Sequence, residues 1–597
     1  MSERKGMVAK VSGTVVIGKG IPDIEVGEVV EVGPERLIGE VIRVRENYFT
    51  CQVYEPTTGI KPGDPILGTG RKLVAELGPG LISNIIDGIG RPLEELLKKV
   101  GPFIKRGVKA FTLPRDKKWT FKPTVKKGEK VSGGDIIGTV QESPMVEHRI
   151  MVPHGVSGTV KEIYEGDFTV TDPVCYVESD GREVPLTMMQ EWPVRMPRPF
   201  KTRLPLEEPL ITGQRVFDVF FPVAKGGAAC IPGGFGTGKT VMLHQLAKWS
   251  DAHVVVYIGC GERGNEMAEV LTDFPRLVDP RTNRPLMERT VLVANTSNMP
   301  VSAREASIYI GVTIAEYFRD MGYHVALMAD STSRWAEAIR EVAGRIGEMP
   351  VERGYPAYLP DRIAEFYERA GRVVAIGRPE RVGSVTIMGA VSPPGGDFNE
   401  PVTIHTLRFT GVFWALDTDL AYSRHFPAVH WLKSYSLYAD SVLSYFVSKA
   451  AKEAEYVKEL PRYREEALKL LSDASEIEAI ARIIGEKALP DDQRLVLLMA
   501  ELIKEGFLRQ FAFDEVDCYC PIEKQAMILK TIMDFYHYAS KLIQARVPIE
   551  KVSSLPVISK MMRMKYNPRG VEYIREVYDE MVSSLKKLAE EYEVQLD

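Results

Sequence analysis

The sequence predicts a multidomain α/β protein with an N-terminal β-barrel, a β-rich insertion, a mainly parallel α/β core and a C-terminal helical bundle. Short β-like runs fill residues 7–75 and 115–190. Apolar strands alternate with amphipathic helices from about 200 to 440, and helical spacing dominates afterwards. A chain of 597 residues is too long for one core. We expect the domains to be 1–75, 76–114 (a connecting segment), 115–190, 191–440 and 441–597.

The two β-rich regions are predicted from short runs that Gly and Pro separate. The expected barrel strands are Met7–Val11, Thr14–Ile17, Val26–Val32, Ile38–Val44 and Phe49–Val53. A short helix is expected at Leu93–Val100. In the insertion, Val125–Val140 and His148–Val160 look like the half-barrels of lipoyl-carrier-like folds. A carrier lysine between acidic and apolar neighbours is not evident there, so we interpret the insertion as structural.

The core and the C-terminal region follow from periodicity. The expected core strands are Val254–Ile258, Thr290–Ala294, Val325–Ala329 and Val385–Gly389. The expected C-terminal helices are Ser475–Glu486, Gln493–Glu505, Ile522–Ala545 and Val571–Tyr592.

Composition narrows the class of protein. Apolar residues make up 45% and charged residues 26%, as in ordinary globular proteins, and the net charge of −5 argues against a nucleic-acid-coating surface. No run of 18 apolar residues predicts a membrane span, and the first residues do not read as a signal peptide. We expect Cys230 and Cys260 to be buried thiols. Cys518 and Cys520 lack a second Cys/His pair for zinc, so we expect two ordinary thiols. The six cysteines do not make a disulfide framework in a chain of this length, so we expect the cytosol to be the compartment.

One octapeptide carries a complete binding mechanism. It reads Gly233-Gly234-Phe235-Gly236-Thr237-Gly238-Lys239-Thr240 and matches G-x-x-x-x-G-K-[ST], the phosphate-binding P-loop. In such a loop, backbone N–H groups point at phosphate oxygens, Lys239 meets the β and γ phosphates, and the Thr240 hydroxyl serves Mg²⁺. The sequence therefore predicts binding of a nucleoside triphosphate.

The context of the loop supports this interpretation. The segment Gly226–Pro232 before it is short and apolar, as a central strand should be. The expected buried face of the helix after it consists of Val241, Leu243, Leu246, Ala247 and Trp249. The alternative is a glycine-rich turn that merely precedes a helix.

Two further strand ends carry carboxylates that phosphoryl transfer could use. The apolar strand His324–Ala329 ends in Asp330, which fits a Walker B residue that holds Mg²⁺ through water. A second strand from Val254 ends in Glu262 and Arg263. Glu262 would orient or deprotonate water, and Arg263 would compensate charge near the γ phosphate. The alternative for this pair is a charged turn in solvent.

Two other segments have weaker signals. Residues Ser392–Asp397 form a predicted tight loop that either contacts a neighbouring subunit or is simply a turn. Phe426 could stack on a base, although most aromatic side chains in such settings belong to the core.

Several strings together resemble one family, the catalytic A subunits of archaeal and vacuolar-type (A/V-type) rotary ATPases. The matching segments are Gly259–Met267, Asn295–Ile308, Ala315–Asp320, Met328–Glu337, Val391–Asp397, Arg424–Ala428, Glu76–Gly80, Pro209–Arg215, Phe221-Pro222 and Phe513–Asp517. The resemblance covers nearly the whole chain. It implies a RecA-like nucleotide domain at the core, and it implies that the insertion is the bulge that F-type beta subunits lack.

The resemblance also implies partners and residue roles. Three A subunits would alternate with three B subunits in an A3B3 ring around a central stalk. Peripheral stalk subunits and, indirectly, the membrane rotor would complete the assembly at the cytoplasmic face of the membrane. Lys239, Glu262 and Arg263 would be catalytic, Thr240 and Asp330 would serve Mg²⁺, and ATP or ADP would be the substrate. Phe426 and Phe513 match the adenine-pocket segments. An arginine finger would come from the B subunits.

One departure and two alternatives accompany the resemblance. Archaeal members commonly have Pro where this chain has Gly234, and Gly has more conformational freedom to lose on ordering.

The leading hypothesis is ATP synthesis or hydrolysis coupled to H⁺ or Na⁺ movement. The alternatives are a nucleotide-binding but non-catalytic member of the same ring, and a hexameric RecA-like helicase or export ATPase. The acidic net charge disfavours a helicase, and no nucleic-acid partner is expected.

Overall fold

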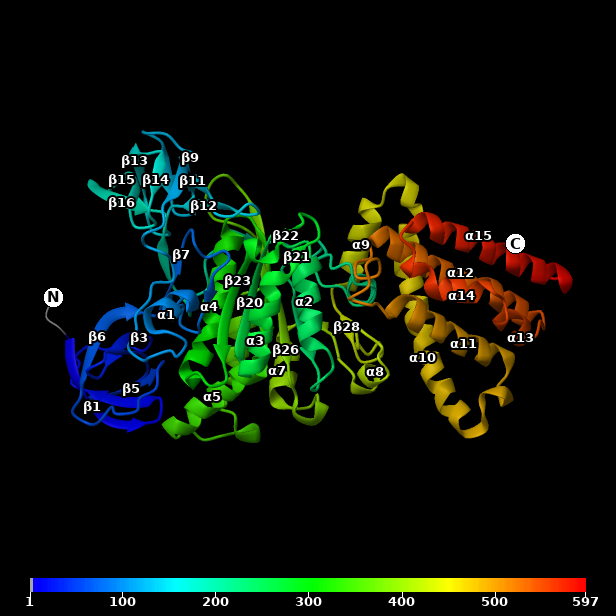
Figure 1. Cartoon of the computed structure of the whole chain (residues 1–597), viewed down its shortest axis with the longest axis horizontal. Coiled ribbons are helices and arrows are strands. Elements are labelled where there is room, and N and C mark those ends of the chain that lie inside the picture. Colours follow the sequence, from blue (N-terminus) through cyan, green and yellow to red (C-terminus); the bar gives the residue numbers. More distant parts are fainter. Residues whose placement is uncertain (1–3, 597) are drawn as a thin grey trace. The chain divides into compact units, whose positions relative to one another are not determined.

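A closed β-barrel begins the chain in the computed structural model, which describes residues 4–596 (Figure 1). Its strand order is β1-β2-β5-β4-β3-β6. The strands are β1 (Arg4–Ser12), β2 (Val15–Lys19), β3 (Glu28–Val32), β4 (Leu37–Arg45), β5 (Tyr48–Val53) and β6 (Pro65–Lys72). Along β3 every second residue is buried, which places Val30 and Val32 in the barrel core. The same alternation buries Glu28, whose carboxylate pairs with Arg4 at 2.6 Å.

The chain divides into two compact units. The first comprises Met1–Pro205, Lys225–Cys230 and Ala252–Thr410, and the second comprises Leu206–Ala224, Ile231–Asp251 and Gly411–Asp597. The strand β19 (Ala228–Pro232) crosses the division, because its first three residues belong to the first unit and its last two to the second.

The β-rich insertion in the first unit contains two four-stranded sheets. Their orders are β10-β13-β15-β16 and β12-β11-β9-β14. The strands are β9 (Trp119–Pro123), β10 (Lys130–Ser132), β11 (Ile136–Gln141), β12 (Glu147–Met151), β13 (Ser157–Ile163), β14 (Gly166–Phe168), β15 (Pro173–Ser179) and β16 (Arg182–Thr187). Before and after the insertion, β7 (Val74–Leu77) and β17 (Gln190–Pro193) pair antiparallel. The helix α1 (Leu93–Val100) has the predicted bounds.

The first unit is built around a parallel sheet. Its order is β19-β26-β24-β20-β23-β8, and β25 (Gly371–Val374) pairs antiparallel with β26 and with β18 (Thr202–Arg203). The strands are β8 (Ile85–Ile86), β20 (Val254–Glu262), β23 (Thr290–Thr296), β24 (His324–Asp330) and β26 (Val382–Val391). The labelled β20, β23 and β26 can be followed in Figure 1. All four predicted core strands are confirmed, and each extends one to four residues beyond its predicted end. The last residues of β20, β23 and β24 pair with a neighbouring strand, which explains the extension of these three.

Helices of the first unit pack on this sheet or on one another. They are α3 (Gly264–Asp273), α4 (Val301–Asp320), α5 (Thr332–Ile346), α6 (Leu359–Tyr367) and α7 (Pro401–Phe409). Almost every residue of α4 is buried, and the helix packs on β20, β24 and β26. An amphipathic surface helix would expose one side, so the almost entirely buried α4 belongs to the core of this unit.

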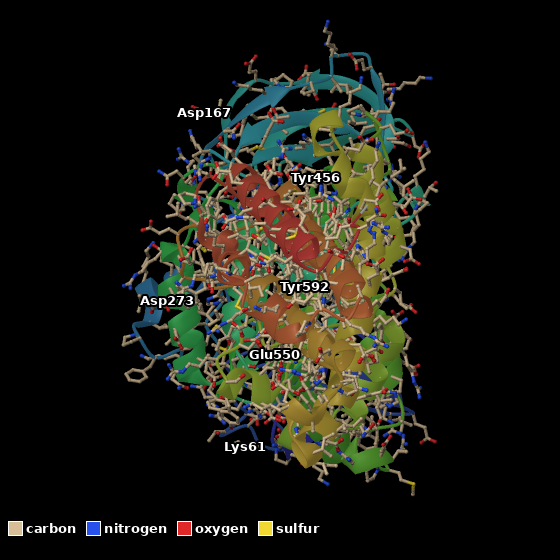
Figure 2. The ribbon with its side chains drawn as sticks, turned by 90° about the vertical axis from the view of Figure 1, so that its right-hand side faces the viewer. Lys61, Asp167, Asp273, Tyr456, Glu550 and Tyr592 are labelled. Atoms are coloured by element: carbon tan, nitrogen blue, oxygen red, sulfur yellow. The ribbon has the colours of Figure 1, made fainter. Side chains whose placement is uncertain are left out.

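The second unit contains α2 (Lys239–Trp249), a short pair of strands and the helical bundle. The strands are β27 (Val412–Phe413) and β28 (Tyr435–Ser436). The helices after Gly411 are α8 (Thr418–Tyr422), α9 (Ala439–Lys449), α10 (Leu460–Ile484), α11 (Asp491–Glu501), α12 (Ile522–Gln544), α13 (Ile549–Ser553), α14 (Val557–Arg563) and α15 (Val571–Glu591). In Figure 2 the bundle faces the viewer, with Glu550 of α13 and Tyr592 after α15 labelled.

Two predicted helices have clearly different bounds, and the two predicted from Ile522 and Val571 each end one residue earlier than predicted. The helix predicted from Ser475 begins at Leu460, because Leu460, Tyr463 and Ala467 already follow helical spacing and are buried. The helix predicted to end at Glu505 ends at Glu501 and continues as a π-helical segment, Leu502–Leu508. No helix within residues 4–596 is both long and apolar enough to cross a membrane.

Candidate active site

The candidate site residues fall into two groups, one in each compact unit. The P-loop, Phe426 and Phe513 belong to the second unit, whereas Glu262, Arg263 and Asp330 belong to the first.

The P-loop lies between β19 and α2, which is the strand–loop–helix context that the sequence predicts. Gly236 and Gly238 have φ angles of 79° and 84°, in the left-handed region that glycine enters without strain. The helix α2 begins at Lys239, directly after Gly238. The partial positive charge at the N-terminus of α2 therefore faces the loop, as binding of a phosphate anion requires.

Side chains of the loop contact its own backbone. Lys239 Nζ donates a hydrogen bond to the carbonyl oxygen of Gly233 at 2.6 Å. The buried Thr237 hydroxyl donates to the carbonyl oxygen of Gly234 at 2.8 Å. Gly234 has a φ outside the left-handed region, and a Cβ there would meet only the Thr418 methyl group, at 3.5 Å. The arch of the loop thus does not depend on the special freedom of glycine at Gly234.

An apolar cavity of about 210 Å³ adjoins the loop within the second unit. It contains both predicted aromatic residues, Phe426 and Phe513, with exposed fractions of 39% and 74%. The other lining residues are Gln214, Phe217, Thr237, Gly238, Val241, Met242, Gln245, Leu416, Pro427, Ala428, Gln510, Phe511 and Ala512. Aromatic walls beside a phosphate-binding loop are suited to a flat heterocyclic base.

Sequence reasoning missed part of this cavity and misplaced one residue. Phe511 was missed, although its spacing from Phe513 in Phe511-Ala512-Phe513 was a usable signal; the two ring centroids lie 5.8 Å apart. The prediction that Val241 lies on the buried face of its helix was wrong. Val241 is 44% exposed and lines the cavity, because this side of the first turn of α2 faces the cavity rather than the core.

The two predicted carboxylates of the first unit end neighbouring parallel strands. Glu262 is the last residue of β20 and Asp330 the last of β24, and Gly259 is opposite Asp330 in the register. Asp330 is 5% exposed, and the Tyr257 hydroxyl donates a hydrogen bond to its Oδ2 at 3.1 Å. The carboxyl ends of parallel strands are where α/β sheets place their sites.

The pKa of the Glu262 carboxyl is raised by its surroundings. Burial raises its pKa to about 8, and the negative charge of Asp330 and a hydrogen bond with Glu266 act in the same direction. Arg334 opposes this shift. A carboxyl with a pKa near the working pH suits a group that takes up and releases a proton.

Two arginines lie near this end of the sheet. Arg263 is exposed and immediately precedes the first residue of α3. Arg334 was not predicted; it lies on α5, and its Nη1 is 3.0 Å from Glu337. Its place four residues after Asp330, in the string Asp330-Ser331-Thr332-Ser333-Arg334, was the available signal.

The segment Ser392–Asp397 follows β26 and forms one 3₁₀ turn at Pro394–Gly396. Asp397 pairs with Arg353 at 3.0 Å. The segment is therefore a turn, and whether it also contacts another subunit stays a prediction.

Comparisons with known proteins agree with this architecture. Four family models match: the ATP synthase alpha/beta β-barrel domain at residues 8–70, the barrel-sandwich domain at 110–195, the nucleotide-binding domain at 213–436, and the C-terminal domain of V and A type ATP synthase at 451–553. These models and the closed barrel confirm the predicted fold class.

Full-length relatives and one solved structure extend the comparison. The A-type ATP synthase A subunit of Thermofilum pendens is 63% identical, covering 100% of this chain and 98% of the relative. The V-type ATP synthase alpha chain of Thermoanaerobacter pseudethanolicus is 57% identical, covering 98% of each. The ATPase EscN of the enteropathogenic E. coli type III secretion system shares the fold, with a TM-score of 0.61 and 23% identity over 88% of this chain and 99% of that one. The chain therefore belongs to the family of A-type and V-type ATP synthase A subunits, the catalytic subunits of an ion-translocating ATPase.

Proposed function

We propose how the residues of this chain perform the family's ATP synthesis or hydrolysis. The P-loop from Gly233 to Thr240 binds the phosphates of ATP or ADP, and Lys239 provides the positive charge. Glu262 acts on water and Arg263 compensates charge near the γ phosphate. Phe426 and Phe513 contact the base. The observation that carries the catalytic assignment is Glu262: a partly buried carboxyl at a strand end with a pKa raised to about 8.

Each assigned residue has a defined task in hydrolysis. When nucleotide binds, Lys239 Nζ leaves the carbonyl oxygen of Gly233 and donates charged hydrogen bonds to the phosphate oxygens instead. Glu262 accepts a proton from the water that attacks the γ phosphorus, while the bond to the bridging oxygen of ADP breaks. In synthesis the same carboxyl returns that proton as water leaves. General base catalysis of this kind contributes roughly 10²- to 10⁴-fold to the rate.

Mg²⁺ fits the residues present. Thr240 provides a hydroxyl and Asp330 a carboxylate, and oxygen donors are those that Mg²⁺ prefers. Among residues 4–596 no cluster of three or more Asp, Glu, His or Cys side chains could hold a metal alone. That agrees with an ion bound by one or two side chains together with substrate phosphates. When bound, Mg²⁺ neutralises phosphate charge, and Tyr257 orients the Asp330 carboxylate through its hydrogen bond.

An ATP synthase of this type works as a complex of several different subunits. We propose an A3B3 ring with three B subunits, which supply an arginine finger, together with central and peripheral stalk subunits. The chain would lie at the cytoplasmic face of the membrane, coupled indirectly to a rotor that moves H⁺ or Na⁺. We also propose the domain division 1–75, 76–114, 115–190, 191–440 and 441–597.

The alternatives are not favoured. A non-catalytic member of the ring would be expected to lose Lys239, Thr240 or Glu262, and all three are present. The likeness to EscN concerns the fold alone, whereas the relatives that match the full length are ATP synthase subunits.

The test is Glu262→Gln in a reconstituted A3B3 ring. Removing the base should lower ATP turnover by about 10²- to 10⁴-fold, whereas nucleotide binding should persist. Glu269→Gln, an exposed position on α3, is the matched control and should keep wild-type turnover. Unchanged turnover in the Glu262 variant would rule out the catalytic assignment.

A further inference from the structure

The guanidinium of Arg215 is fully buried in the second unit and all its nitrogens are engaged. Nε donates to the carbonyl oxygen of Phe507 at 2.5 Å, and Nη2 donates to that of Arg509 at 2.8 Å. Nη1 donates to Asp517 Oδ1 at 2.6 Å, and Nη2 also reaches Asp517 Oδ2 at 3.3 Å. One side chain therefore holds three points of the segment Phe507–Asp517.

That segment carries Phe511 and Phe513, which line the apolar cavity. The two residues are 53% and 74% exposed, so burial of their rings contributes little to holding the segment in place. Asp517 Oδ2 instead accepts a hydrogen bond from the Phe511 backbone N–H at 3.0 Å. The Asp517 carboxylate thus connects Arg215 directly to the backbone of an aromatic wall residue.

Gln510 connects the other aromatic segment of the cavity, which contains Phe426. Its backbone N–H donates to the carbonyl oxygen of Phe426 at 2.9 Å. Its side-chain Nε2 donates to the carbonyl oxygens of Gly213 and Asp517, at 2.9 and 2.8 Å, and its Oε1 accepts from the Arg215 backbone N–H at 2.8 Å. The same network therefore spans the two aromatic segments of the cavity.

From these contacts we infer that Arg215, with Asp517 and Gln510, is a positioning residue for the base-binding cavity: it sets affinity for the nucleobase and not for the phosphates. The inference rests on the proposed function, in which the cavity holds the base and the P-loop the phosphates. The guanidinium donates its hydrogen bonds to the segment Phe507–Asp517, whereas Lys239 and Thr237 donate theirs within the P-loop. The planar fork of arginine matches a carboxylate and two carbonyls at once, which a lysine ammonium cannot do.

A buried ion pair by itself does not imply this role, because such pairs also occur as structural elements that add little stability. The two interpretations differ in what a broken pair does. A structural role predicts equal effects on every ligand of the second unit. A positioning role predicts an effect confined to ligands that carry a base.

The experiment compares ATP with inorganic tripolyphosphate, which has the phosphates but no base, by calorimetric titration of the full-length chain. The first variant is Asp517→Asn, which keeps the shape and breaks the ion pair. The second, R215M/D517L, replaces the pair by apolar side chains of similar volume, and such replacements tend to preserve stability. The control is Asp534→Asn, which breaks the Lys530–Asp534 pair on α12; neither residue lines the cavity.

Both test variants should raise the Kd for ATP about tenfold, within the range of stacking losses, and leave the Kd for tripolyphosphate within about twofold. The control should change neither. Unchanged ATP affinity, or equal weakening of both ligands, would overturn the positioning role. Failure of the proposed function looks different, since the wild-type chain itself would then bind neither ligand, or would bind both equally well.

Discussion

Replacing Lys565 by Met should change how the stability of the second unit depends on pH. Lys565 is 1% exposed, and its Nζ donates to the carbonyl oxygens of Glu505 and Arg509, the latter at 2.7 Å. Burial lowers the pKa of this lysine to about 7, and the positive charge of Arg215 acts in the same direction. The lysine is therefore largely neutral above pH 7 in the folded chain, whereas in the unfolded chain it stays charged up to about pH 10.4.

Whether the free energy of unfolding rises or falls with pH depends on which state of the chain binds more protons. Between the folded and unfolded pKa values the unfolded chain binds the extra proton, so the free energy of unfolding rises with pH. The cost of burying the charge is fully present below pH 7 and is relieved progressively as the pH rises from the folded pKa of about 7 toward the unfolded pKa of about 10.4. The free energy of unfolding changes by about 1.4 kcal/mol per pH unit for one proton. Between pH 7 and pH 9.5 it should therefore rise by about 3 kcal/mol more in wild type than in the Met variant.

The measurement is amide hydrogen exchange in the peptide that covers residues 502–510, corrected for intrinsic exchange at each pH. The Met variant also loses the two hydrogen bonds of Lys565, which lowers its stability by the same amount at every pH. Only the change with pH in the stability difference between wild type and K565M therefore tests the prediction. Lys530→Met is the control, because the partners of Lys530 raise its pKa and it should not titrate in this window. The account fails if the difference between wild type and K565M stays flat from pH 7 to 9.5, or if the control shows the same pH dependence.

Three further outcomes are expected. Asp330→Asn should raise the Mg²⁺ concentration for half-maximal ATP turnover by about 10- to 100-fold, as loss of an outer-shell ligand does; an unchanged Mg²⁺ titration would remove Asp330 from that role. Gly238→Ala should weaken ATP binding about tenfold, because φ at Gly238 is 84° and alanine is strained there, whereas Gly234→Ala should leave the Kd for ATP within about twofold. A larger loss of ATP affinity in the Gly234 variant than in the Gly238 variant, measured by calorimetry, would contradict the loop geometry. Phe513→Ala should raise the KM for ATP by about 5- to 100-fold with kcat largely kept, and a loss confined to kcat would speak against contact with the base.

Much of the molecule could be predicted because its signals are local. The P-loop is a contiguous string, and its glycine pattern specifies the backbone turns that are observed at Gly236 and Gly238. The core strands are continuous apolar runs, and five of the six barrel strands are short β-like runs that Gly and Pro separate, so local patterns located them. The sixth barrel strand, β6, was not predicted. The carboxylates Glu262 and Asp330 could be found because each stands at the end of such a strand.

Other features depend on residues that are far apart in the sequence. Arg215 and Asp517 are 302 positions apart, and nothing near either one predicts the pair. The raised pKa of Glu262 comes from burial and from charges on other segments, which a sequence window does not contain. The exposed position of Val241 reflects which side of α2 meets the cavity.

Contiguous stretches of the chain were thus enough to predict the fold class, which is confirmed, and to propose the phosphate-binding loop and the reactive side chains. The folded chain was needed for the shape of the apolar cavity, the network around Arg215 and the unusual proton affinities of Glu262 and Lys565. These features escape a sequence window because burial and electrostatic neighbours are set by packing between distant segments.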